Sequence, residues 1–305
     1  MRKVWLASYP KSGNTWFRML LANLSSPDGK PADINDLPLR GGIASAREPF
    51  DDLTLIDSGL LTHDETDALR PRVYEALAGG DDGMDDAPPE GNTAPQVRFA
   101  KTHDAYTRTP KGEPLLAGRG GAAAAIVIVR DPRDVAASLA NHKAVGIDDA
   151  IAFMSDFNAA FCSRPRRQYN QFRQKLLTWS EHVASWLDQT DIPVHCVHYE
   201  DMQADTGGAL RDALAFAQRE ASAAQIARAV RLASFAQLQA QEKAKGFREG
   251  PRPRPDGRFF RRGEAGAWRD ELTAEQVARI ESDHAAMMRR LGYPLTATPR
   301  LAEAG

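Results

Sequence analysis

Residues 4–24, Val-Trp-Leu-Ala-Ser-Tyr-Pro-Lys-Ser-Gly-Asn-Thr-Trp-Phe-Arg-Met-Leu-Leu-Ala-Asn-Leu, constrain the fold of this chain more than any other segment. The apolar run Val4–Ser8 predicts a strand, a polar turn follows, and apolar residues at helical spacing predict a helix over about 15–24. A strand, a tight turn and a helix form the unit from which α/β folds are built. The usual nucleotide-binding order, Gly-x-x-x-x-Gly-Lys-[Ser/Thr], is absent from this turn because Lys11 precedes Gly13.

The bulk composition limits the partners of the chain. Its 305 residues suffice for a substantial hydrophobic core, and we expect residues 1–305 to form a single domain. The net charge of −2 provides no global positive field, so we expect no nucleic-acid partner. Cys162 and Cys196 match neither a disulfide framework nor a Cys-x-x-Cys pair. No run approaches the ~20 apolar residues of a membrane span. The first residues lack a signal-peptide pattern, so we expect a cytoplasmic protein.

Further apolar runs predict strands that alternate with helices. Ala124–Val129 is almost continuously apolar, as expected of a strand buried on both faces. Gln-Val-Arg-Phe-Ala-Lys-Thr and Ile-Pro-Val-His-Cys-Val-His predict two more short strands. Helical spacing predicts helices over 175–189, 206–217, 222–232 and 273–291. The alternation predicts an α/β fold, a single domain with a mainly parallel central sheet flanked by helices.

The region between the first two predicted strands is less regular. Residues 25–60 are rich in turn-forming residues and predict irregular structure. Thr62 and Glu65 then match a capping box at the start of a helix, in which Pro71 predicts a break. Residues 79–95 are acidic and rich in Gly and Pro, and predict a flexible surface loop.

The opening turn is suited to binding an anion. Backbone N–H groups at the start of a helix are unsatisfied and carry partial positive charge. Gly13 lacks a Cβ, so the backbone can approach an anion closely, and Lys11 adds a mobile charge. Ser12, Asn14 and Thr15 add side-chain donors. An ordinary capped strand–helix turn explains the same residues, so this loop alone leaves both interpretations open.

Two later segments carry side chains that bind anions. Arg130 follows the buried strand, and Ser138 lies about two helical turns further on. Arg261, Arg262 and Gly263 form a basic turn that can bond a phosphate in bidentate fashion. Taken alone, Arg130 is also explained by an ion pair with a nearby aspartate, and the Arg261–Arg262 pair is also explained by a solvated basic loop. Three anion-binding segments in one chain indicate a ligand with more than one anionic group.

A histidine follows the second predicted strand. His103 titrates near neutral pH without assistance, and Lys101, two positions earlier, places a charge beside it. A lone histidine is more often structural than catalytic. Next to three anion-binding segments, it becomes a candidate general base.

These motifs resemble the sulfotransferase family that uses 3′-phosphoadenosine 5′-phosphosulfate (PAPS). The family's first signature, Tyr-Pro-Lys-Ser-Gly-x-Thr-Trp, matches Tyr9–Trp16, and its middle signature matches Val129–Leu139. Its last signature, Arg-Lys-Gly-x-x-Gly-x-Trp-Lys, matches the stretch from Arg261 onwards, and its Lys-Thr-His matches Lys101–His103. Shorter matches occur at His198–Met202 and Ala233–Leu238. The resemblance extends from residue 4 to about residue 293. This chain has Asn14, Ala233, Arg262 and Ala267 where many members have Thr, Thr, Lys and Asp.

The resemblance implies a fold of the P-loop-kinase-like type, and it implies roles for these residues. The 5′-phosphosulfate would be held by Lys11, Ser12, Gly13, Asn14 and Thr15. Trp16 would stack near the adenine, and Phe235, with Ser234, would line the adenine pocket. The 3′-phosphate would be bound by Arg130, Ser138, Arg261, Arg262 and Gly263. His103 would take the acceptor proton, Lys11 would stabilise the leaving phosphate, and Ser138 would restrain Lys11 before the acceptor arrives.

The resemblance also implies the reaction, an in-line transfer of a sulfuryl group from PAPS to a hydroxyl, or less readily an amine, with no metal required. The product would be adenosine 3′,5′-bisphosphate (PAP). A nucleotide-dependent kinase of related fold and a non-catalytic phosphonucleotide-binding module are the alternatives. Residues 40–97 form a long insertion on the expected acceptor side, either a lid or surface elaboration. The acceptor, a small molecule, lipid or glycan, and the oligomeric state are not assigned by the sequence.

Overall fold

The computed structural model describes residues 2–24, 26, 29–37, 42–79, 97–164, 169–250 and 258–296. Within these residues the central sheet has four parallel strands in the order β2-β1-β3-β6. They are β1 (Arg2–Ser8), β2 (Val97–Thr102), β3 (Ala124–Val129) and β6 (Val194–His198). The predicted α/β fold with a parallel central sheet is confirmed. A small antiparallel pair, β4 (Ala160–Phe161) with β5 (Gln174–Lys175), lies apart from it.

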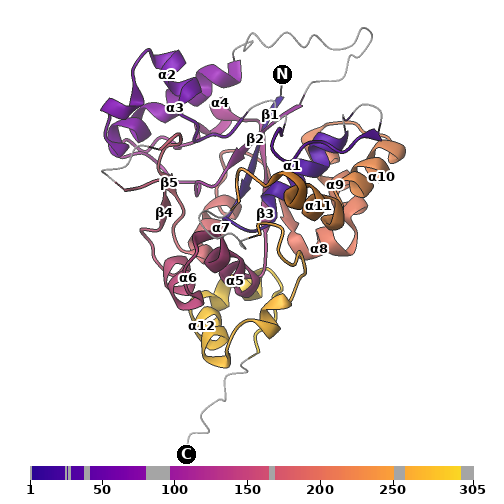
Figure 1. Cartoon of the computed structure of the whole chain (residues 1–305). Helices are drawn as coiled ribbons and strands as arrows, with labels where there is room; N and C mark the ends of the chain where they lie inside the picture. Colours follow the sequence, from indigo (N-terminus) through magenta and orange to yellow (C-terminus); the bar gives the residue numbers. More distant parts are fainter. Residues whose placement is uncertain are drawn as a thin grey trace, which may run out of the picture.

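Both faces of the central sheet are covered, because successive side chains of a strand point to opposite faces. Val4 and Leu6 of β1 pack into one hydrophobic core, whereas Trp5 and Ala7 pack into the other. Figure 1 shows α1, α9, α10 and α11 together on one side of the sheet. Their apolar faces form the first core, while α5, α6, α7 and α12 contribute to the second. This burial explains the almost continuous apolar run of β3.

The helices agree with most of the predicted ranges. They are α1 (Asn14–Leu24), α2 (Glu48–Thr54), α3 (His63–Gly79), α4 (Gly118–Gly121), α5 (Pro132–Lys143), α6 (Ile147–Met154), α7 (Trp179–Leu187), α8 (Tyr199–Ala204), α9 (Thr206–Ala217), α10 (Ala223–Leu232), α11 (Phe235–Lys245) and α12 (Ala274–Arg290). Single 3₁₀ turns lie at η2 (Ser58–Leu60) and η3 (Ala267–Asp270). None of the described helices is long and apolar enough to cross a membrane.

Three expectations about these elements were wrong. The segment 175–189 starts as part of β5, and its helix begins only at Trp179, where Thr178 caps it. Residues 25–60 contain α2, which uses Pro49 in its first turn. The helix α3 continues through Pro71, although the capping box at Thr62 and Glu65 is present as predicted. Buried side chains on either side of the proline hold α3 in place and outweigh the lost backbone hydrogen bond.

The region between β1 and β2 packs firmly against the sheet. Residues 42–46 run beside β2, where the Ala44 N–H donates to the Lys101 carbonyl at 2.8 Å and the Lys101 N–H donates to the Gly42 carbonyl at 3.1 Å. Figure 1 shows α2, α3 and α4 grouped beyond this edge. The acidic loop predicted over 79–95 lies outside the described residues, apart from Gly79, which ends α3.

Candidate functional site

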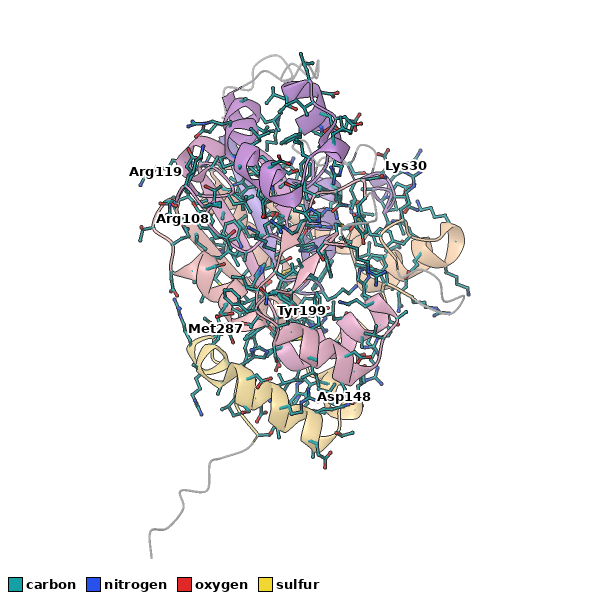
Figure 2. The ribbon with its side chains drawn as sticks, turned by 90° about the vertical axis from the view of Figure 1, so that its left-hand side faces the viewer. Lys30, Arg108, Arg119, Asp148, Tyr199 and Met287 are labelled. Carbon is teal, nitrogen blue, oxygen red and sulfur yellow. The ribbon has the colours of Figure 1, made fainter. Side chains whose placement is uncertain are left out.

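The carboxyl ends of the four parallel strands meet at one edge of the sheet, and each is followed by a residue that lines one cavity. Lys11 follows β1, His103 follows β2, Arg130 follows β3 and Tyr199 follows β6. This edge is where open α/β sheets bind their ligands. The cavity has a volume of about 490 Å³. Figure 2 shows Tyr199 in the interior of the molecule, while Arg108 and Arg119 reach outward from its surface.

Almost all of the predicted site residues come together in this cavity. Those that line it are Lys11, Gly13, Asn14, Thr15, Trp16, His103, Arg130, Ser138, Phe235, Arg261, Arg262 and Gly263. Ser12 is fully buried beneath the loop and does not line the cavity, and its hydroxyl has no partner among the described residues.

The loop after β1 has a strained backbone that brings it close to neighbouring side chains. Lys11 adopts a left-handed conformation with φ of 71°, which is uncommon for a residue with a side chain. Gly13 has φ of 107°, and a Cβ added there would lie 2.6 Å from the ring of Tyr199. Only glycine fits this position, so the loop can present its backbone closely to a ligand.

The Lys11 ammonium group has an unusual environment. Its Nζ lies 3.4 Å from the centre of the Phe259 ring. Burial, together with the charges of Arg130 and Lys101, lowers the pKa of Lys11 to about 7. An anion in the cavity would relieve both effects, since it supplies the missing negative charge. The cavity therefore favours a negatively charged ligand beside Lys11.

His103 is held in one tautomer by a backbone carbonyl. Its Nδ1 lies 2.8 Å from the carbonyl oxygen of Ser8, which can only accept a hydrogen bond. Nδ1 therefore carries the proton and Nε2 keeps a free lone pair. Burial and the nearby charge of Lys101 hold the pKa of His103 well below its usual value. The imidazole is neutral at physiological pH and can accept a proton at Nε2.

Arg130 extends along the opposite wall of the cavity. Its guanidinium lies 4.1 Å from the centre of the Tyr199 ring and donates to the Glu264 carbonyl at 2.9 Å. The carboxylate of Asp134 lies 3.7 Å from it, so the predicted ion pair with a nearby aspartate is also present. The Nε atom of Arg130 is buried and has no hydrogen-bond partner in the part of the chain that the structure describes. Ser138, two turns further along α5, is half-buried and lines the same cavity.

The last signature forms a loop anchored on α5. The carboxylate of Asp134 accepts the N–H groups of Gly266 at 2.7 Å and Trp268 at 2.9 Å. Gly263 has φ of 69°, and a Cβ added there would lie 2.3 Å from the Phe235 ring. The loop therefore packs its backbone directly on that aromatic ring.

The two arginines of this loop are already paired with acidic residues. Arg261 lies 2.7 Å from Glu271, and Arg262 lies 3.3 Å from both Asp270 and Glu271. They are neither unpaired nor simply solvated. A phosphate that binds both guanidinium groups would compete with these half-exposed ion pairs, which are individually weak.

Asn14 differs from the expected donor. Its amide nitrogen donates to the Leu6 carbonyl at 3.1 Å and to the Ser8 hydroxyl at 3.3 Å, so both donors point into the protein. The cause is that α1 begins at Asn14, one residue earlier than the sequence pattern predicts. Its backbone remains at the cavity, while its side chain braces β1.

Two residues that the sequence pattern did not single out also line the cavity. Tyr199 packs edge-on against Trp16, whose indole N–H donates to the Ala233 carbonyl at 3.0 Å. Glu249 forms ion pairs with Arg18 at 2.7 Å and Lys101 at 3.1 Å. Tyr199 directly follows a predicted strand, which was a usable signal. No motif marks Glu249.

The side of the cavity nearest residues 42–46 is lined by a mixture of polar and aromatic side chains. Gln171 accepts hydrogen bonds from Ser45 and Gln174, each at 3.0 Å. His142 lies between the rings of Phe161 and Phe259, at centroid distances of 6.5 and 6.2 Å. The Nδ1 atom of His142 is buried, and no described residue forms a hydrogen bond with it. This side has both aromatic surface and unused hydrogen-bonding capacity.

The described residues contain no group of three or more His, Cys, Asp or Glu side chains placed to hold a metal ion. The charged residues described at the cavity are the basic Lys11, Lys101, Arg130, Lys143, Arg248, Arg261 and Arg262 and the acidic Asp134, Glu249, Glu264 and Glu271.

Comparison with known proteins supports a single family. A family model described as "Sulfotransferase domain" matches residues 1–292. A curated relative, the amine sulfotransferase of Oryctolagus cuniculus, is 24% identical over 199 residues, which cover 61% of this chain and 60% of the relative. The match therefore spans somewhat less than two thirds of that relative's own length.

Solved structures share the fold. Retinol dehydratase in complex with androsterone and inactive cofactor PAP matches with a TM-score of 0.57 at 20% identity, over 95% of this chain and 82% of that one. Mouse sulfotransferase SULT7A1 complexed with PAP matches with a TM-score of 0.55 at 19% identity, over 94% of this chain and 84% of that one.

Proposed function

The chain belongs to the sulfotransferase domain family, and on that premise we propose that it transfers a sulfuryl group from PAPS to a hydroxyl of an acceptor. The observation that carries the proposal is that the neutral Nε2 of His103 and the buried ammonium of Lys11 line one cavity, together with two further basic segments. A proton acceptor and a cation for a leaving group are the two chemical parts that such a transfer needs from the protein.

The residues present fit a nucleotide with two separate anionic groups. Among the described residues, the Lys11 ammonium group has no ion pair and the buried Nε of Arg130 has no hydrogen-bond partner. Backbone at Gly13 and Gly263 approaches aromatic rings so closely that no Cβ is tolerated. We assign the 5′-phosphosulfate to residues 11–15. The 3′-phosphate falls to Arg130, Ser138, Arg261, Arg262 and Gly263, and the adenine to Trp16, Tyr199 and Phe235.

PAPS supplies an activated sulfuryl group whose bond to the phosphate breaks during transfer. Lys11 stabilises the negative charge that develops on the phosphate side, because a buried cation interacts strongly with charge in a cavity that excludes water. His103 accepts the acceptor's O–H proton at Nε2, an effect typically worth ~10²–10⁴-fold. Ser138 restrains Lys11 until the acceptor is present.

The acceptor is proposed to be a small molecule or the hydroxyl of a lipid or glycan. The aromatic rings of Phe161 and Phe259 offer apolar contact, while Gln171, Gln174 and His142 offer hydrogen bonds to further polar groups. An amine is the second candidate, favoured by the name of the rabbit relative.

A transfer assay tests this proposal. Radiolabelled sulfate should move from PAPS to at least one member of a panel of phenols, sugars, lipid alcohols and amines, with EDTA present. Lys11→Ala and His103→Ala should each reduce the rate at least ~100-fold. His103→Ala should still bind PAP with a Kd within about threefold of the unchanged protein, because it acts on the proton and not on the phosphates. A His103→Ala variant that keeps most of its activity would show that the base is another group.

A thermal shift measurement helps to separate the proposed function from its two alternatives, a nucleotide-dependent kinase and a non-catalytic phosphonucleotide-binding module. PAP should raise the melting temperature without Mg²⁺, while ATP should not, because ATP lacks the 3′-phosphate that Arg130 and the loop after residue 260 would bind. A kinase would respond to ATP with Mg²⁺. A binding module without catalysis would respond to PAP but transfer no sulfate.

A further inference from the structure

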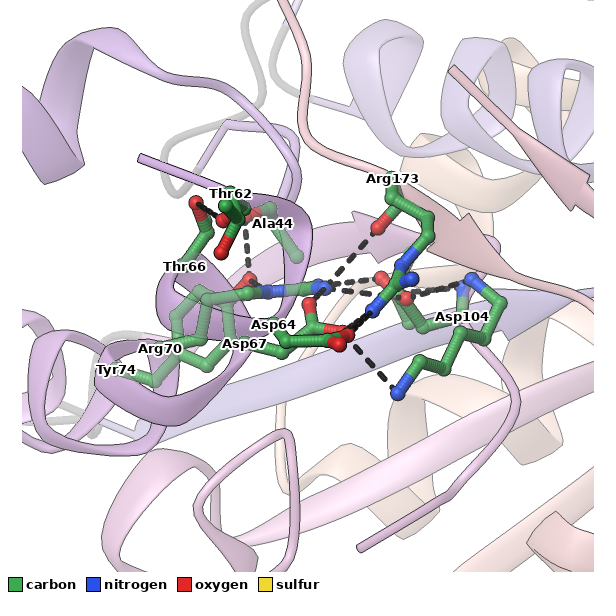
Figure 3. A network of polar contacts seen from close by, with 11 residues as sticks. Ala44, Thr62, Asp64, Thr66, Asp67, Arg70, Tyr74, Asp104 and Arg173 are labelled. Atoms are coloured by element: carbon green, nitrogen blue, oxygen red, sulfur yellow. Dashed lines mark hydrogen bonds and ion pairs between the residues drawn. The ribbon is translucent and has the colours of Figure 1, made fainter. Parts of the chain in front are cut away.

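Arg70 is a fully buried arginine in the region between β1 and β2. Figure 3 shows it on α3, with its guanidinium pointing toward Asp104. Its Nη2 lies 2.5 Å from the Asp104 carboxylate, and its Nη1 donates to Asp67 and to the Arg173 carbonyl, each at 3.2 Å. Its Nε donates to the Tyr74 hydroxyl at 2.9 Å. Every nitrogen of the guanidinium is used.

Asp104 directly follows the proposed base, His103, and all of its polar groups are engaged. Its N–H donates to the Thr102 hydroxyl at 3.0 Å, and its carbonyl accepts the Trp186 indole N–H at 3.0 Å. Its carboxylate accepts the Lys175 N–H at 3.1 Å in addition to Arg70. The backbone on the carboxyl side of His103 is therefore clamped in one position.

The same arginine joins two other segments that border the cavity. Tyr74, which accepts from Arg70, donates to the Ala44 carbonyl at 2.7 Å. Ala44 in turn pairs with Lys101 of β2. The Arg173 carbonyl, which also accepts from Arg70, lies between Gln171 and Gln174 in the chain. The side chain of Arg70 thus connects α3 with the turn after His103, with the segment at Ala44 and with the segment at Arg173.

Burying a charged side chain costs free energy of folding, so the presence of the buried Arg70–Asp104 pair needs an explanation. Burying an arginine and an aspartate removes both from water, and an apolar pair of similar size would often stabilise a fold as well or better. Such a pair does, however, fix geometry, because every donor must find its acceptor. Here the geometry that it fixes is that of the residue next to the proposed base.

We propose that Arg70 and Asp104 are a positioning pair for His103, and that residues 42–79 form a fixed wall of the acceptor side instead of a moving lid. This inference rests on the proposed function, because it assumes that His103 is the base. Arg70 does not touch the reacting atoms. It acts through Asp104, which holds the turn while the Ser8 carbonyl holds the ring at Nδ1. A misplacement of about 1 Å in a reacting group can cost ~100-fold in rate.

The test compares Arg70→Gln with Arg72→Gln, which is the same substitution two residues along α3. Arg72 has a side chain that is 70% exposed and pairs only with Glu75 and Glu113 among the described residues. Arg70→Gln should lower kcat by ~10–100-fold, while KM for PAPS and the Kd for PAP change by less than about threefold. Arg72→Gln should leave all three values within about twofold of the unchanged protein. Asp104→Asn keeps the shape of the side chain and an acceptor for Lys175, and should lower kcat about tenfold.

A second readout does not depend on activity. In the ligand-free protein, the Nδ1–H proton of His103 should give a slowly exchanging NMR signal, identified by its loss in His103→Gln. The signal should persist in Arg72→Gln and should broaden or exchange rapidly in Arg70→Gln and Asp104→Asn. A merely structural role for Arg70 would lower the melting temperature without moving this signal or separating kcat from KM.

The outcomes distinguish the two proposals. Unchanged kcat and an unchanged His103 signal in Arg70→Gln would overturn the positioning role. If Arg70→Gln does not fold, the same two measurements on Asp104→Asn decide, and wild-type values there overturn it. If the unchanged protein transfers no sulfate to any acceptor, the proposed function fails, while the His103 signal still decides whether this pair holds the imidazole.

Discussion

The environment of Lys11 predicts that the rate of sulfate transfer falls at alkaline pH. In the proposed mechanism Lys11 must be protonated to stabilise the leaving phosphate, and burial together with Arg130 and Lys101 lowers its pKa to about 7. The protonated fraction falls about tenfold for each pH unit above that value. We therefore predict that kcat/KM for PAPS, which reports the free enzyme, falls about 50-fold between pH 7, where half of the ammonium groups are protonated, and pH 9. His103 adds no limb in this range, because its pKa lies well below its usual value and it is already neutral.

The limb of kcat at saturating PAPS should lie at higher pH than the limb of kcat/KM. Bound phosphosulfate places negative charge beside Lys11, which raises the pKa of its ammonium group. Initial rates of sulfate transfer at pH 6–10 measure both limbs.

Two lysine-to-arginine variants identify the group that titrates. A guanidinium stays charged throughout this range, so Lys11→Arg should keep a reduced but pH-independent kcat/KM up to pH 9. Lys101→Arg is the matched control, because the pKa of Lys101 is also lowered by burial but its ammonium is paired with Glu249. The limb should survive in Lys101→Arg. A flat wild-type profile through pH 9, or a limb that persists in Lys11→Arg, would refute the role given to Lys11.

Three further predictions concern the loops around the cavity. Gly263→Ala should weaken PAP binding more than ~10-fold by calorimetry, since its Cβ would lie 2.3 Å from the Phe235 ring. Gly112→Ala is the control, because Gly112 also has a positive φ but has open space around it. This substitution should lower the free energy of unfolding by only ~1 kcal/mol. Asp134→Asn should lower the free energy of unfolding by ~2 kcal/mol in urea titrations, because one of two loop N–H groups loses its charged acceptor. Glu249→Gln should be less stable than the unchanged protein at pH 7. Ion pairing lowers the pKa of Glu249 to about 2, so this stability is lost as the pH falls from 4.5 toward 2, and the gap should close over that interval. A gap that stays constant from pH 7 to pH 2 would contradict the ion-pair assignment.

Much of the fold was predictable because it depends on local patterns. The apolar runs in the sequence at β1 and β3 indicate that these strands are buried and where they begin and end. The polar turns that follow them mark the edge at which α/β sheets bind ligands. Tyr199 follows β6 in the same way as Arg130 follows β3, so the same rule applied once more would have included it. The site was predictable wherever a functional residue directly follows a strand.

The remaining features depend on contacts between distant parts of the chain. Arg70 and Asp104 are 34 positions apart, and nothing in a helix of mixed charge shows which arginine is buried. Glu249 reaches the cavity through ion pairs with Arg18 and Lys101, which belong to other elements. Asn14 turned inward because α1 starts one residue early, a boundary that periodicity cannot resolve.

The dependence on contacts between distant residues also explains why the structure of the described part of the insertion was not predicted. Its polar, turn-rich sequence suggested either a lid or surface elaboration, and neither α2 nor the passage of α3 through Pro71 was apparent. The described part is held to the sheet edge by backbone pairing at Ala44 and by the buried Arg70. Tertiary contacts outweighed local propensity in this region.

The central claim is that one cavity carries out sulfuryl transfer with His103 as its base. The most direct test is the transfer of ³⁵S-sulfate from PAPS to an acceptor panel in EDTA, with the unchanged protein and His103→Ala side by side. The account predicts label in at least one acceptor, a loss of at least ~100-fold in His103→Ala, and equal PAP binding by both proteins. Equal transfer by the two proteins, or no transfer by the unchanged protein despite tight PAP binding, would contradict it.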